Sequence, residues 1–205
     1  AKGTRADGFM ELTYPAVNTP AIPFFSVMYP VAVYEYIKHT GDKTILSETM
    51  PVMLKIMNNF KEKIDATGLI KSFPAPYWNF YEWTKDLTNG IRVVDEPMLE
   101  AALNCLLSIA LQNLQKICDL LEVDATYGSL SEEMNKHIRS TFYREETGLY
   151  INRYGEEQYS ELVNALAVLC GAAEEVEAEI ICEKLVTHDF MTKASLSMMC
   201  FKYEA

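Results

Sequence analysis

Apolar side chains recur every three or four residues along most of this chain, and this period is typical of helices that bury one side. The clearest run opens after Asp95-Glu96-Pro97, a combination of acidic groups and proline that suits a helix N-terminus. Its apolar members are Leu99, Leu103, Leu106, Leu107, Ala110, Leu114, Ile117 and Leu121. A second run comprises Met50, Met53, Leu54, Met57, Phe60 and Ile64. The pattern therefore predicts an all-α fold.

Further helices are predicted where the same period returns, which brings the total to about seven. They cover residues 25–40, 130–142, 159–171, 174–186 and 192–204. Short connections between them favour antiparallel helical hairpins. Residues 67–71 and 147–152 instead place a glycine before a short β-prone run, and they predict two small hairpins. Long strands do not alternate with the helices, so a parallel sheet is not expected.

Helical hairpins in series form a bundle, an open solenoid or a closed toroid. Solenoid repeats show self-similarity at a fixed period, and successive hairpins of this chain show no repeated signature of that kind. The toroid is therefore favoured, in its partial form, because a ring of six hairpins needs nearly twice this length. We expect residues 1–205 to form a single domain.

The composition restricts the possible partners. A formal net charge of −11 repels phosphate backbones and anionic lipid headgroups, and no basic stripe offsets it, so neither nucleic acid nor membrane is an expected partner. No apolar run approaches the roughly 20 residues that cross a bilayer. The five cysteines form no CxxC pair, and the N-terminus lacks a secretory pattern, which together predict a cytoplasmic location.

Sequence motifs for metal or cofactor chemistry are missing. The three histidines, His39, His137 and His188, are scattered and show no spacing typical of metal ligands. The chain contains no Walker loop, dinucleotide fingerprint, nucleophile elbow or H-E-x-x-H sequence. We therefore expect neither a metal nor a cofactor.

Residues 73–83 are unusually aromatic and contain both tryptophans of the chain. Pro74 and Pro76 exclude a regular helix there, so the segment is predicted to be a loop. Sugar sites need flat aromatic faces together with carboxylates and amides, and the loop offers these groups in Trp78, Asn79, Glu82 and Trp83. The alternative is a loop whose aromatic rings fold back to seal the helical layer. Composition alone leaves both interpretations open.

Several segments, taken in order, resemble the catalytic barrel of bacterial α-L-rhamnosidases. The segment Trp78-Asn-Phe-Tyr-Glu-Trp83 is similar to the Trp-x-Phe-x-Asp/Glu-Trp segment of that family. The other similar segments are Asp7-Gly8 with Tyr14-Pro15-Ala16, residues 22–29, residues 34–42, residues 68–70, residues 159–171 and residues 193–205. The resemblance implies part of an (α/α)₆ barrel from an inverting glycoside hydrolase that acts on terminal α-L-rhamnosides. It also implies that Trp78, Asn79, Glu82 and Trp83 contact the substrate.

The same resemblance indicates what the chain lacks. The family's general acid lies in an Arg-Asp-Glu…Gly-Trp stretch, and its general base lies in a Gly-Ala-Thr-Ser-x-Trp-Glu stretch. Neither stretch occurs here, so both catalytic carboxylates are expected outside this chain. A Trp and an acidic residue that many relatives carry are also missing near residues 18–24, which leaves open an (α/α)₆ hydrolase or lyase with another sugar as substrate.

Two further expectations concern binding. A non-catalytic helical protein that binds a partner through its apolar grooves is an alternative function from a different class. Half of a toroid also leaves apolar helix faces uncovered at its edges, so self-association through those edges is expected.

Overall fold

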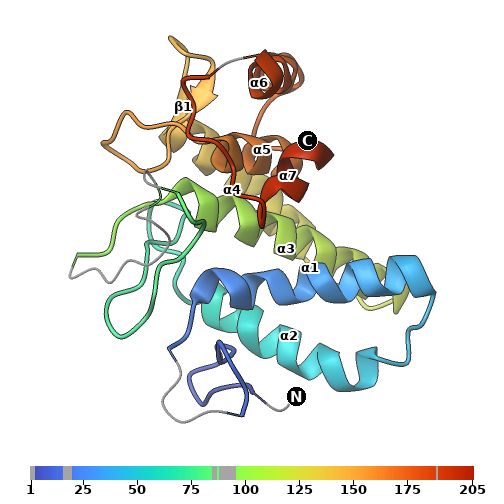
Figure 1. Cartoon of the computed structure of the whole chain (residues 1–205). Coiled ribbons are helices and arrows are strands. Elements are labelled where there is room, and N and C mark those ends of the chain that lie inside the picture. The colour runs from blue at the N-terminus through green and yellow to red at the C-terminus, as the bar shows by residue number, and fades with distance from the viewer. Residues whose placement is uncertain (1–2, 16–19, 85–86, 88–95, 188) are drawn as a thin grey trace.

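The computed structural model describes residues 3–15, 20–84, 87, 96–187 and 189–205 (Figure 1). Within these residues the chain forms seven helices and one two-stranded antiparallel sheet, which confirms the predicted all-α class. In chain order the elements are α1 (Pro23–Thr40), α2 (Leu46–Lys61), α3 (Ala101–Leu120), α4 (Tyr127–Phe142), β1 (Tyr143–Arg144), β2 (Leu149–Tyr150), α5 (Glu161–Cys170), α6 (Glu175–Thr187) and α7 (Met199–Glu204).

The helices form two layers. The odd-numbered helices contact one another in series, α1 with α3, α3 with α5, and α5 with α7. Each even-numbered helix packs against the odd-numbered helix that precedes it, so α2, α4 and α6 form a second, outer layer. Three successive hairpins and the first helix of a fourth are therefore arranged as part of an (α/α)₆ toroid (Figure 1).

The distribution of apolar residues explains which helix enters which layer. The inner helix α5 buries eight of its ten residues, because neighbours cover it on several sides. The outer helix α4 buries Ser131, Met134, Ile138 and Phe142, which follow steps of three or four residues and form one stripe. Among the described residues, none of the helices combines the length and apolar content needed to cross a bilayer.

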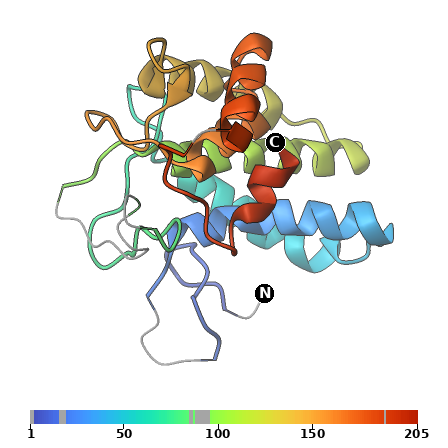
Figure 2. The ribbon, with the colours of Figure 1, turned by 45° about the horizontal axis from the view of Figure 1, so that its top comes forward.

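The two ends of the helical layers differ in their connections. Within each hairpin the helices are joined by residues 41–45, 121–126 and 171–174. Gly41 and Gly171 end α1 and α5 there with φ of 71° and 77°, a left-handed conformation that glycine adopts without strain. The connections from an outer to an inner helix are longer, and Figures 1 and 2 show them gathered near the N-terminal ends of α1 and α3.

A buried asparagine joins each of two inner helices to the chain segment that arrives from the outer layer. Asn104, the fourth residue of α3, accepts a hydrogen bond from the N–H of Ile70 and donates to its carbonyl, both at 2.9 Å. Asn164, the fourth residue of α5, does the same with Tyr150 at 2.9 and 3.1 Å. Both side chains are fully buried, so each bond is shielded from water.

A related contact occurs in the first hairpin. Ser26, the fourth residue of α1, accepts a hydrogen bond at 3.0 Å from the N–H of Met10. We call each of these contacts a clamp, and the residue whose backbone it holds, Met10, Ile70 or Tyr150, the clamped residue. In all three cases the clamped residue lies two positions after a glycine with positive φ, namely Gly8 at 88°, Gly68 at 73° and Gly148 at 64°. The three hairpins thus share one local structure at their inner helix N-termini.

Two predicted elements differ from the structure. The helix predicted over residues 192–204 begins only at Met199, because the N–H groups that precede it bond to other segments. Thr192 donates to the carbonyl of Tyr159, and Ala194 donates to the carboxylate of Glu161. Residues 67–71 form an isolated bridge between Lys71 and Leu99 instead of a hairpin, whereas the hairpin predicted near 147–152 is confirmed by β1 and β2.

Candidate functional site

The aromatic loop, residues 73–83, lies against the N-terminal ends of α1 and α3. The N–H of Trp78 donates to the carbonyl of Ala21 at 3.1 Å, just before α1 begins. The hydroxyl of Tyr81 donates to the carboxylate of Glu100, just before α3 begins. Tyr81 also packs edge to face on Phe24, with ring centroids 5.2 Å apart. These contacts fix the loop at the end of the molecule that carries the long connections.

Asn79 closes the loop on itself. Its side-chain oxygen accepts from the N–H of Phe73 and its side-chain nitrogen donates to the carbonyl of Phe73, both at 2.8 Å. The residue is only 2% exposed. The carboxamide that was predicted to contact a sugar is therefore used to hold the backbone of the loop.

The two tryptophans differ in exposure. Trp83 is 62% exposed, and its ring rests on the edge of Phe80 with centroids 4.9 Å apart. Phe80 in turn packs on Phe25 of α1 at 5.5 Å. Trp78 is partly buried and packs against the core. Phe80 and Tyr81 thus seal the helical layer, as the packing interpretation predicts, while Trp83 presents an indole to solvent.

Glu82 directly precedes this exposed tryptophan in the sequence and is fully buried. One carboxylate oxygen accepts the N–H of Ser195, from the connection between α6 and α7. The other oxygen, Oε2, has no hydrogen-bond partner among the described residues. Burial raises the pKa of the Glu82 carboxyl, and the negative charge of Glu161 adds to the effect. The protonated form is therefore favoured more here than in water.

Glu161, the first residue of α5, is a carboxylate with the opposite tendency. It accepts hydrogen bonds from the N–H of Ala194 at 2.9 Å and from the ammonium of Lys202 at 2.7 Å, and Lys193 lies 3.3 Å away. Burial alone disfavours its charge, but the Lys202 and Ala194 contacts outweigh that effect and lower the pKa of the Glu161 carboxyl. Two neighbouring carboxyls are thus shifted in opposite directions.

A buried ion pair also supports the loop. Arg153 contacts Glu100 at 2.8 Å and Glu156 at 2.9 Å. Burial by itself would lower the pKa of the Arg153 guanidinium, but the two carboxylates raise it above its ordinary value. Because Glu100 also accepts from Tyr81, the ion pair links the aromatic loop to the connection before α5.

The sequence interpretation missed Glu100, Arg153 and Glu161 as parts of this site. One signal was available, since Glu100 directly precedes α3 and Glu161 opens α5, and acidic groups at helix N-termini are stabilised by the helix dipole. Residues 16–19, which include part of the stretch where a Trp and an acidic residue were expected, lie outside the described residues.

Three solved rhamnosidase structures share this fold. A GH78 family rhamnosidase of Bacillus sp. GL1 matches 93% of this chain with a TM-score of 0.80 and 22% identity. A rhamnosidase from Klebsiella oxytoca with rhamnose bound matches 98% with a TM-score of 0.78 and 16% identity. An alpha-L-rhamnosidase from Dictyoglumus thermophilum matches 98% with a TM-score of 0.71 and 15% identity. These identities show a shared fold.

The matched region is a limited part of each relative. The chain covers 20%, 38% and 23% of the three solved chains, respectively. A comparison with curated protein sequences finds no match. The family model described as the bacterial alpha-L-rhamnosidase 6 hairpin glycosidase domain matches residues 1–194, which is most of the sequence. The chain therefore belongs to the bacterial α-L-rhamnosidase six-hairpin glycosidase family.

Proposed function

We propose that the protein to which these residues belong hydrolyses terminal α-L-rhamnosides with inversion at the anomeric carbon. Membership of the six-hairpin family is the observation that supports this most strongly. An exposed indole at the end of the molecule with the long connections is consistent with it, because sugar sites need a flat aromatic face.

The proposed mechanism assigns this chain a binding role. Inversion needs a general acid and a general base, typically about 6.5–9.5 Å apart on opposite sides of the sugar. The sequence stretches that carry these two residues in the family do not occur here. Glu82 is an unsuitable substitute, because the described structure leaves none of its surface open to a substrate. We therefore assign both catalytic carboxylates to residues outside the chain.

Within the proposed site the four predicted residues divide into two groups. Trp83, and the accessible part of Trp78, supply aromatic faces for the apolar side of the sugar ring. Glu82 and Asn79 are buried and hold the loop in place through Ser195 and Phe73. The binding surface is thus preorganised, which lowers the entropy lost when a sugar binds.

Tryptophan fluorescence tests this proposal directly, because both tryptophans belong to the loop. We expect rhamnose to quench the emission of the 205-residue chain in a saturable manner, and we expect Trp83→Ala to abolish that response. Tyr203→Ala removes another exposed aromatic side chain, 77% exposed on α7, and should leave the quenching unchanged. A spectrum unchanged by rhamnose would support the non-catalytic alternative.

A different sugar is the second candidate substrate, because residues 18–24 lack the Trp and the acidic residue that many relatives carry. The same titration with galactose, glucose and fucose separates the two possibilities. Stronger quenching by one of these sugars than by rhamnose would replace the substrate while leaving the site unchanged.

We further propose self-association through the uncovered faces of the partial toroid. Val176 and Val186 of α6 are 67% and 84% exposed, and Tyr203 of α7 is 77% exposed. Burial of such side chains between copies of the chain removes apolar surface from water. Light scattering after gel filtration should give a mass above 23.3 kDa. A stable monomer that binds little hydrophobic dye would contradict this.

A cytoplasmic location is proposed from the thiols. All five cysteines are free, and Cys105, Cys118 and Cys170 are buried, as expected of a protein kept in a reducing environment. Alkylation at cell lysis followed by mass spectrometry should find all five thiols modified after denaturation. An intermolecular disulfide formed in the cell would contradict the proposed location.

A further inference from the structure

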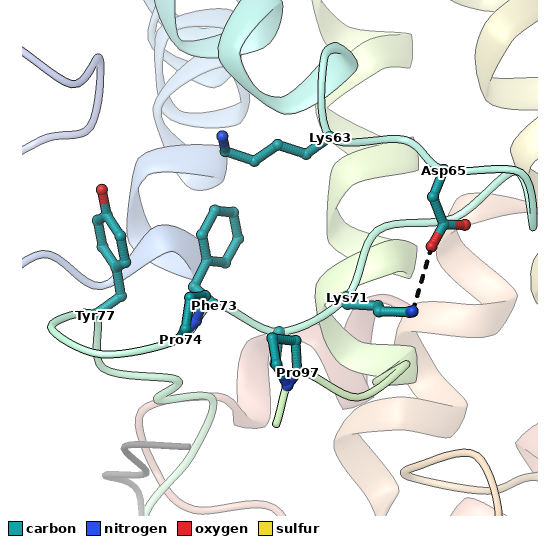
Figure 3. Close-up of a pocket in the computed structure, with 8 residues that line it drawn as sticks. Lys63, Asp65, Lys71, Phe73, Pro74, Tyr77 and Pro97 are labelled. Atoms are coloured by element: carbon teal, nitrogen blue, oxygen red, sulfur yellow. Dashed lines mark ion pairs between the residues drawn. The ribbon is translucent and has the colours of Figure 1, made fainter. Parts of the chain in front are cut away.

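A pocket of about 370 Å³ lies between the C-terminal end of α2 and the first part of the aromatic loop (Figure 3). Its volume falls within the range of roughly 300–1,000 Å³ that is typical of small-molecule sites. Lys63, Lys71, Phe73 and Tyr77 contribute to its lining, whereas Trp78, Glu82 and Trp83 do not. It is therefore distinct from the surface proposed to bind rhamnose.

The aromatic wall of this pocket is rigid. Phe73 and Tyr77 pack edge to face at 5.5 Å, and both rings contact Phe9 at 5.2 Å. The phenol of Tyr77 donates a hydrogen bond to Asp7 at 3.0 Å, which fixes the direction of its ring. The backbone of Phe73 is held by Asn79 on both its N–H and its carbonyl. A ligand that stacks on this wall meets a surface that is already ordered.

Two ammonium groups stand beside the wall. Lys63 lies 5.9 Å from the centre of the Phe73 ring, and among the described residues no carboxylate pairs with it. Lys71 forms an ion pair of 3.7 Å with Asp65. Figure 3 shows the Lys63 side chain extended beside Phe73, while Lys71 turns toward Asp65. The pocket thus keeps an unpaired positive charge within a chain whose formal net charge is −11.

We propose that this pocket binds a sugar residue that carries a carboxylate, that is, a uronic acid. The apolar face of the ring would lie on the wall formed by Tyr77 and its neighbouring prolines, and the carboxylate would meet the ammonium of Lys63. A neutral sugar would leave that charge unpaired, so the charge favours the acidic ring. The choice of a sugar rests on the proposed function, whereas the positive charge of the pocket does not.

A matched pair of ligands tests the proposal on the 205-residue chain. Methyl α-D-galacturonide and methyl α-D-galactoside differ in whether the ring bears a carboxylate or a hydroxymethyl group. Saturation-transfer NMR and calorimetry should show binding of the uronide and weaker binding, by at least about threefold, of the neutral sugar. The difference should shrink at high ionic strength, because salt screens exposed charges.

Charge-removing variants locate the site. Lys63→Gln should weaken binding of the uronide by about twofold to fivefold, the range expected for an exposed charge pair, and should leave the neutral sugar unaffected. Lys136→Gln removes an equal charge from the exposed surface of α4 and should change neither affinity. Comparable thermal unfolding of the variants and the parent chain confirms that the fold is retained.

Three results would overturn the proposal. They are equal affinity for the two methyl glycosides, full retention of uronide binding in Lys63→Gln, and saturable binding of benzoate with none of the uronide. The last would assign the pocket to an aromatic acid. Each result is independent of the rhamnose titration, because Trp83, which reports on rhamnose, does not line this pocket, so the two proposals fail separately.

Discussion

The N-terminal ends of α3 and α5 share one local structure, but the segments that lead into the two helices differ in length. At both ends a glycine with positive φ precedes a buried leucine, and the residue after the leucine is clamped by the fourth residue of the helix. Before α5 only residues 151–160 separate the clamped residue from the helix. Before α3 the corresponding segment, residues 71–100, includes the aromatic loop.

This difference separates the parts that maintain the toroid from the parts that recognise a ligand. The clamp recurs because each inner helix must receive a chain segment from the outer layer without leaving buried backbone groups unpaired. The longer segment before α3 follows the clamped residue and is not needed for the clamp. It carries Trp78, Trp83 and most of the residues that line the pocket beside Lys63. Loops that are positioned by a rigid scaffold commonly carry function.

Removal of either asparagine is expected to give the largest effect. Asn104→Ala and Asn164→Ala each delete hydrogen bonds to a buried backbone N–H and carbonyl, which then lack partners. The unfolding free energy should fall by about 3–4 kcal/mol in each variant. Urea unfolding followed by circular dichroism measures this value.

Whether Asn104→Ala and Asn164→Ala lose similar amounts of stability tests the equivalence of the two helix ends more sharply than either loss alone. Asn58→Ala, on the exposed surface of α2, serves as the matched control and should change stability by less than about 0.5 kcal/mol. If one clamp variant were as stable as the control while the other was not, the two helix ends would not be equivalent. The shared clamp would then be a coincidence of geometry.

Gly68 and Gly148 occupy equivalent positions before α3 and α5, but replacement by alanine is expected to cost more stability at Gly68 than at Gly148. A Cβ on Gly68 would lie 2.3 Å from the His137 ring, whereas a Cβ on Gly148 would lie 3.2 Å from Ile180. Both residues have positive φ, which alone costs an alanine about 1 kcal/mol. Gly68→Ala should therefore cost about 2–3 kcal/mol and Gly148→Ala about 1 kcal/mol, measured by urea unfolding.

Truncation of the histidine tests the cause of that difference. His137→Ala removes the ring that the new methyl group would meet, so in this background Gly68→Ala should cost only the backbone term of about 1 kcal/mol. An unchanged cost in the double variant would show that the close contact with His137 is not what distinguishes the two glycines.

The repeating scaffold could be predicted from the sequence only in part. The helical period located all seven helices, because inner and outer helices alike must bury a stripe. The clamp gives no repeat of fixed period in the sequence, because the spacing from Gly68 to Asn104 is much longer than the spacing from Gly148 to Asn164. The longer segment before α3 therefore hides, in the sequence, a local structure that recurs before α5.

The candidate site was predicted less completely. The composition of residues 73–83 predicted an aromatic loop, since its prolines exclude a regular helix, and the structure has no helix there. The sequence could not say which polar groups face solvent. Asn79 and Glu82 are buried by partners distant in sequence or by a turn of the loop, and such contacts leave no local pattern.

The first hairpin offers a weaker version of the clamp. Ser26 of α1 accepts one hydrogen bond, from Met10, where the asparagines make two contacts with the incoming segment. Ser26→Ala should therefore lower the unfolding free energy by about 1 kcal/mol, because a single donor loses its partner. Ser26→Asn tests whether an asparagine at this position can bond both the N–H and the carbonyl of Met10. A stability above that of the parent chain would show that α1 can accept the full clamp.

The smallest expected effect compares the two neighbouring carboxyls, Glu82 in the longer segment and Glu161 at the start of α5. Burial raises the pKa of Glu82 above its ordinary value of 4.5, so the folded state holds this proton more tightly than the unfolded state does. Its contribution to stability is complete below pH 4.5 and is lost as the pH rises through the folded-state pKa. Glu161 has a lowered pKa, so its contribution is complete above its ordinary pKa and is lost on acidification.

Glu82→Gln should therefore flatten the fall in stability that begins as the pH rises above 4.5, and it should raise the unfolding free energy at pH 7, because the neutral amide places no charge in this buried position. The glutamine keeps an acceptor for the N–H of Ser195. Glu161→Gln should instead lower stability at pH 7, since Lys202 and Ala194 lose a charged acceptor. Urea unfolding at a series of pH values measures both variants. Equal changes of the same sign would mean that the two carboxyls share one environment. The segment before α3 and the start of α5 would then not differ in how they treat a buried carboxyl.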